Sequence, residues 1–128
     1  MIGARPSRAD RGQATVELAL GLPVVLLAVL VILQVGLVVR DQIRTVHAAR
    51  EAARASAVDG RYGVARAAAL AGSGLDPSRL SVLTSGRDGV GSRVRVQVIY
   101  RAETNVPLAG ALVPDPVLRA EATMRVEE

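Results

Sequence analysis

Apolar side chains follow two different patterns along this chain, one continuous and one alternating. Residues 18–39 form an uncharged run in which Gln34 is the one strongly polar side chain. As a helix, these 22 residues would extend about 33 Å, enough to cross a hydrocarbon core of about 30 Å. A core helix of a soluble domain is rarely apolar on every side over such a length. The run therefore predicts a membrane span at residues 18–39.

The helical pattern continues beyond the span. Residues 41–58 contain neither Gly nor Pro and are rich in Ala, the best helix former. Asp59-Gly60 then provides a stop, because glycine tolerates the left-handed conformation that often follows a helix. We therefore predict one rod from about Thr15 to Val58, within a helical segment assigned to residues 13–58.

The predicted extension has two unlike faces. One is a charged stripe that consists of Arg40, Arg44, His47, Glu51 and Arg54. The opposite face carries small side chains, among them Ala49, Ala52 and Ala53. The small face either packs on the rest of the chain or allows a neighbouring helix to approach closely in an assembly. The pattern leaves both interpretations open.

The remainder, residues 59–128, predicts a small domain. A short helix is expected at residues 63–71, and residues 105–116, with three prolines, read as a long connection. Alternation of apolar and polar side chains predicts strands at residues 79–85, 93–103 and 117–127. The expected fold class is α+β, with a long N-terminal helix, one short helix and a small three-stranded antiparallel sheet. The short helix or the rod would cover the apolar face of that sheet.

The chain begins with a short basic tail. Its charged residues are Arg5, Arg8, Asp10 and Arg11. We expect residues 1–17 to be flexible and cytoplasmic. An ordinary signal peptide fits poorly, because the apolar run is long and no small-x-small cleavage site follows it. Glu17 stands where that run begins, and there it either has an intramembrane function or starts the helix at headgroup level.

Composition narrows the chemistry that is available. The chain has no Cys, and all 16 of its Lys and Arg residues are arginine, so disulfide, thiol and lysine chemistry are excluded. His47 is the single histidine, which leaves no ligand set for a metal and no activated nucleophile. The net charge is only +4, the arginines are dispersed, and Phe and Trp are absent, so nucleic-acid binding is not expected. We predict a protein that is not an enzyme and has no cofactor.

Residues 12–17, Gly-Gln-Ala-Thr-Val-Glu, resemble the type IV prepilin processing motif, in which a Gly precedes the cut and a Glu is the fifth residue after it. The longer string from Arg11 to Ala57 is similar to the TadE-like minor pseudopilins of tight-adherence (Flp-type) pilus machines. Residues 122–127 also look like that family. Leu18 is a departure, since family members usually have an aromatic residue after the glutamate.

The resemblance implies that a prepilin peptidase removes residues 1–12, so that Gln13 becomes the new N-terminus. It implies a single-pass protein of the cell membrane with a cytoplasmic N-terminus and an extracytoplasmic domain. Its partners would be the lipid bilayer, the peptidase, other pilins or pseudopilins and the pilus assembly platform. Glu17 would pair with the Gln13 amine of another subunit in a low dielectric. The alternatives are an unprocessed, monomeric membrane-anchored adaptor and a secreted protein with an unusual signal.

Overall fold

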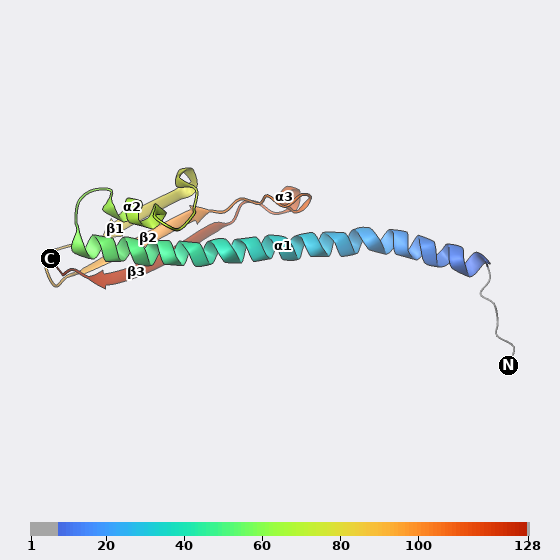
Figure 1. The fold of residues 1–128 in the computed structure, drawn as a ribbon, viewed down its shortest axis with the longest axis horizontal. Helices are drawn as coiled ribbons and strands as arrows, with labels where there is room; N and C mark the ends of the chain where they lie inside the picture. The colour runs from blue at the N-terminus through green and yellow to red at the C-terminus, as the bar shows by residue number, and fades with distance from the viewer. Residues whose placement is uncertain (1–7, 128) are drawn as a thin grey trace, which may run out of the picture.

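The computed structural model describes residues 8–127 and shows a long helix lying along a three-stranded sheet (Figure 1). The expected α+β fold is confirmed, with its long helix, short second helix and antiparallel sheet. In chain order the elements are α1 (Arg8–Val58), α2 (Val64–Leu70), the 3-10 turn η1 (Pro77–Arg79), β1 (Leu80–Ser85), β2 (Arg93–Arg101), α3 (Ala109–Leu112) and β3 (Val117–Arg125).

Helix α1 starts earlier than predicted. It begins at Arg8 and passes through Pro23 without a break, so the expectation of a flexible tail is wrong for residues 8–17. Once a long helix is nucleated, each added residue gains one hydrogen bond, and residues 8–17 contain no proline that would stop the helix. The first seven residues of the predicted tail lie outside the described residues.

The sheet has the strand order β1-β2-β3, and both pairs are antiparallel. The alternation that predicted β2 is borne out, since every second residue from Val94 to Tyr100 is buried and the flanking Arg93 and Arg95 are exposed. Strand β2 stands in the middle of the sheet, with Val96 opposite Thr84 on one side and Ala122 on the other. Its buried side chains therefore define the middle of the core.

The core lies between the sheet and the second half of α1. Helix α1 contacts β2 and β3, whereas α2 contacts β1 and α1. The largest fully buried side chains are only valines and a threonine, namely Val94, Val96, Val98 and Thr45. Because the facing residues of α1 are mostly alanine, the helix can lie close to the strands without leaving a void.

The first half of α1 has no such cover. Its large apolar side chains are exposed from Val16 to Leu27, and Figure 1 shows this part of the helix extending away from the sheet. Within the described residues, α1 is the one helix long and apolar enough to cross a membrane. A bare apolar helix is unfavourable in water and favourable in lipid, so this half of α1 is suited to a single membrane span.

Candidate functional site

The residues of the predicted processing motif lie near the exposed N-terminal end of α1. Gln13 and Glu17 share one face of the helix, because residues four apart are neighbours on a helix surface. The Gln13 Nε2 donates a hydrogen bond to the Glu17 Oε1 at 3.2 Å. Both side chains are exposed, so they are available to another molecule. They belong to the N-terminal part of α1, which extends away from the sheet in Figure 1.

Gly12 is not required by the fold of this chain. A Cβ added at Gly12 would meet no atom within 4 Å. Glycine in a helix interior costs about 1 kcal/mol relative to alanine, so Gly12 weakens this part of α1 slightly. The bond between Gly12 and Gln13 lies inside the helix, and a peptidase would reach it only after the first turns open. Any requirement for glycine at this position therefore comes from a partner.

The small-residue face of α1 packs inside the subunit. Ala49, Ala52 and Ala53 are at most 1 % exposed and belong to the core formed with the sheet and α2. A neighbouring subunit is not needed to cover these three alanines, because the chain's own core already buries them. Of the two interpretations of the sequence, the structure shows packing on the chain's own domain. Local periodicity identified the packing face but could not identify what packs on it.

The charged stripe of α1 remains at the surface. His47, Glu51 and Arg54 are exposed, while Arg44 is half-buried with its Nη1 at 3.9 Å from the Asp41 Oδ1. Between residues 8 and 127, no group of three or more His, Cys, Asp or Glu side chains could hold a metal ion. The stripe is therefore a solvent-exposed face, and its described side chains form no metal-binding group.

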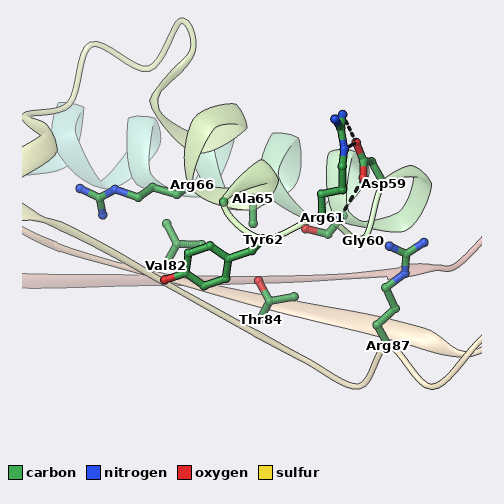
Figure 2. A pocket seen from close by; sticks show the side chains of 11 residues that line it. Asp59, Gly60, Arg61, Tyr62, Ala65, Arg66, Val82, Thr84 and Arg87 are labelled. Carbon is green, nitrogen blue, oxygen red and sulfur yellow. Dashed lines mark hydrogen bonds and ion pairs between the residues drawn. The ribbon is translucent and has the colours of Figure 1, made fainter.

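A shallow groove of about 340 Å³ lies between the α1–α2 connection and β1. Figure 2 shows arginines at both ends of it, with Tyr62 between them. Asp59 accepts hydrogen bonds from the backbone N and the Nε of Arg61, and this pair holds the pKa of Asp59 below its ordinary value. Arg66 donates to the carbonyl oxygens of Leu80 and Pro77, both at 2.7 Å. These charged groups thus stabilise the turns around the groove.

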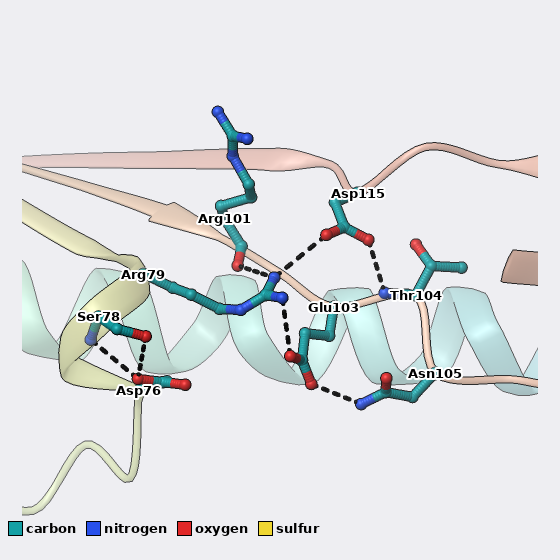
Figure 3. A network of polar contacts seen from close by, with 8 residues as sticks. All are labelled: Asp76, Ser78, Arg79, Arg101, Glu103, Thr104, Asn105 and Asp115. Carbon is teal, nitrogen blue, oxygen red and sulfur yellow. Dashed lines mark hydrogen bonds and ion pairs between the residues drawn. The ribbon is translucent and has the colours of Figure 1, made fainter.

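A second polar cluster holds the two ends of the connection between β2 and β3 (Figure 3). The Arg79 guanidinium contacts the Glu103 Oε1 at 2.7 Å and the Asp115 Oδ2 at 3.1 Å, and its Nη1 donates to the Arg101 carbonyl oxygen at 3.3 Å. The backbone N of Thr104 donates to the other Asp115 oxygen at 3.1 Å. Arg79 therefore ties the start of the sheet to both ends of the 105–116 segment.

Sequence reasoning missed this arrangement, since it treated residues 105–116 as a plain connection. The segment instead contains α3, which lies beside α1 beyond the end of the sheet (Figure 1). One signal was present in the sequence: no charged residue occurs between Glu103 and Asp115. An uncharged stretch of that length is unusual for a solvated loop.

The Arg79 cluster predicts a pH dependence. The hydrogen bond from the Thr104 backbone N, and then the one from Arg79, hold the pKa of Asp115 below its ordinary 3.8. Because the pKa of Asp115 is lowered in the folded state, its carboxylate stabilises the cluster at pH values above the ordinary pKa. That stabilisation is lost as the pH falls through the lowered pKa. We expect hydrogen-exchange protection of residues 103–116 to decrease below about pH 4, and Arg79→Gln to cause the same decrease at neutral pH.

The control for that prediction is Arg61→Gln, which removes another exposed Arg–Asp pair at the opposite end of the domain. It should leave protection of residues 103–116 unchanged. Equal protection in wild type and Arg79→Gln would mean that the cluster does not hold the segment.

One stretch of the chain matches a known protein family. A family model described as TadE-like protein matches residues 12–54, which confirms the family resemblance over that stretch. The match covers the Gly12–Glu17 motif and most of α1, and ends before α2. No curated protein and no solved structure matches the chain.

Proposed function

We propose that this chain, TadE-like over residues 12–54, is a membrane-anchored structural subunit of a tight-adherence (Flp-type) pilus assembly machine. The observation that carries the proposal is the exposed apolar surface of α1, which lies within the matched stretch and directly follows the Gly12–Glu17 motif. A structural subunit needs a surface that lipid or other helices cover and a motif that a partner can reach. Helix α1 offers both.

In this proposal residues 18–39 cross the cell membrane once. The N-terminus is cytoplasmic, and residues 59–128 form an extracytoplasmic domain. The continuous course of α1 supports a rigid connection between the span and the domain, because one uninterrupted helix joins them. Movement of the span within the membrane would therefore move the domain with it.

Processing by a prepilin peptidase would cut between Gly12 and Gln13 and leave a positively charged amine at Gln13. A carboxylate and an amine that remain unpaired at the edge of lipid are costly, so the two groups favour contact. Gln13 and Glu17 lie on one face and about 6 Å apart along the axis, the rise of four residues. A neighbouring subunit shifted by about one helical turn would bring its amine level with Glu17.

The test is the mature N-terminus of the protein isolated from membranes. We expect it to start at Gln13, and we expect Gly12→Val to abolish cleavage and leave full-length protein in the membrane. The added side chain would obstruct the close approach of the peptidase to the backbone. N-terminal sequencing and the mobility of the protein on an immunoblot measure both results.

Gly21→Val is the matched control, because Gly21 also lies in α1 and a Cβ there meets no atom within 4 Å. This variant should be cleaved normally. Full-length protein in the wild type would instead support the second candidate, an unprocessed single-span adaptor. One observation favours that candidate: the bond to be cut lies inside a helix that begins at Arg8.

A further inference from the structure

The segment of residues 105–116 lies beside the part of α1 that the sequence predicts to be in the membrane. Its short helix α3 and the end of the segment share an apolar cleft of about 270 Å³ with α1. The residues around that cleft are Val31, Gln34, Val35, Val38, Val39, Ala109, Val113 and Pro116. Gln34 is five residues from the end of the span, which places it about 7.5 Å along the helix from that end.

Helix α1 and the 105–116 segment change from charged to uncharged at the same level. On α1 the charges resume at Arg40, directly after Val39. On the segment they resume at Asp115, next to Pro116, and Val39 and Pro116 border the same cleft. Two stretches far apart in sequence thus share one boundary between polar and apolar surroundings, as expected of two stretches that enter the same membrane surface.

The outer side of the segment is apolar and uncovered. Leu108 is 62 % exposed and Leu112 is 69 % exposed, while Ala109 is buried against α1. The small residue therefore faces the helix and the large ones face outward. In water this arrangement is unfavourable, whereas in the upper acyl region of a bilayer it is favourable.

The segment also shields the polar residue of the span. Gln34 is only 5 % exposed, although its neighbours Leu33 and Val35 on α1 are exposed. Neither Oε1 nor Nε2 of Gln34 has a hydrogen-bond partner among the described residues. An amide that faced acyl chains would be costly, and the segment separates this one from them.

Backbone hydrogen bonding limits how deep the segment can go. Irregular backbone does not occur exposed in the hydrocarbon core, because its polar groups find no partners there. Three of the residues are prolines without an N–H, and the N–H groups of Ala109, Gly110 and Val113 donate to carbonyl oxygens within the segment. The carbonyl oxygen of Pro116 accepts from the Ala102 backbone N at 3.0 Å. Polar groups of the segment without such a partner require water, which favours a shallow position about 5–10 Å into the interface.

We propose that residues 105–116 insert into the membrane surface on the domain's side, with Leu108, Leu112 and Val113 in contact with lipid acyl chains. The Arg79 cluster then lies at headgroup level and holds both ends of the inserted segment. The domain is thereby attached to the membrane at two places, the span and this segment. The inference rests on the proposed function, because it requires α1 to be a membrane span.

The experiment uses single cysteines, since the chain has none of its own. Full-length Leu112→Cys would carry an environment-sensitive fluorophore in vesicles of phosphatidylcholine and phosphatidylglycerol. We expect the label at position 112 to emit at a shorter wavelength than the same fluorophore free in buffer. We also expect lipids with a nitroxide on the acyl chain to quench it strongly. Val90→Cys is the exposed control in the turn at the other end of the sheet, and it should be quenched only by a water-soluble quencher.

Val25→Cys, at an exposed position in the first half of α1, distinguishes a failure of the insertion of residues 105–116 from a failure of the membrane span. Quenching by the nitroxide lipid at position 25 but not at position 112 would overturn the insertion and leave the span. Absence of quenching at both positions would overturn the span and, with it, the proposed function. Loss of lipid quenching at position 112 together with energy transfer between labelled copies would assign the surface to a second copy of the chain, and this also overturns the proposal.

Discussion

Glu17→Val is expected to give a protein that enters the membrane and is cut normally but does not assemble. Removal of a charge makes insertion easier, so the amount of membrane protein should not fall. Folding should also be unaffected, because Glu17 is exposed on α1 and its hydrogen bond joins it to Gln13 and not to the domain. The amine of a neighbouring subunit, however, would lose its partner at the edge of lipid.

Removal of one partner of a buried ion pair costs about 3–5 kcal/mol, which corresponds to a loss of assembly of more than roughly a hundredfold. The measurement is co-purification with other pilus components, beside an immunoblot for the size of the variant. Gln13→Ala is the matched control, because it removes the 3.2 Å hydrogen bond and keeps both the new amine and the carboxylate. It should assemble. Assembly of Glu17→Val at the wild-type level would eliminate the pairing.

The second large effect is expected from Ala53→Leu, which should destabilise the domain itself. Ala53 is fully buried in the core that α1 forms with the sheet and α2. Three added heavy atoms in a close-packed core force side chains or backbone to shift, at a cost of about 1–3 kcal/mol. For a domain of this size the unfolding midpoint should fall on the order of 10 °C.

Thermal unfolding of the full chain in detergent, followed by circular dichroism, measures that effect. Ala67→Leu is the control, since Ala67 is exposed on α2 and the substitution is the same. An unchanged midpoint in Ala53→Leu, with weakened crosslinking between subunits, would restore the interpretation in which the small face contacts a neighbour.

Periodicity along the sequence was enough to predict the long helix and the three strands of this protein, but it did not predict the short helix α3. The uncharged run 18–39 predicted a long apolar helix and the alternation around Val96 predicted the central strand, because these patterns follow from helix and strand geometry alone. The Gly12–Glu17 motif within the TadE-like match was also readable, because its residues are adjacent in the chain. The start of α1 was not, since the propagation of a helix past Gly12 depends on the length of the helix behind it.

Only the tertiary structure decided which surfaces meet. Whether Ala53 faced the chain's own sheet or another subunit depended on contacts between α1 and the strands β2 and β3, which are distant in the sequence. The position of α3 beside residues 31–39 of α1 depended on β3 running along α1, where the Gln42 Nε2 donates to the Arg119 carbonyl oxygen at 3.2 Å. Local sequence patterns indicate which face of a helix or strand is apolar. The partner of that face is selected by packing of the whole chain, because the hydrophobic effect is non-directional and any apolar surface of suitable shape can satisfy it.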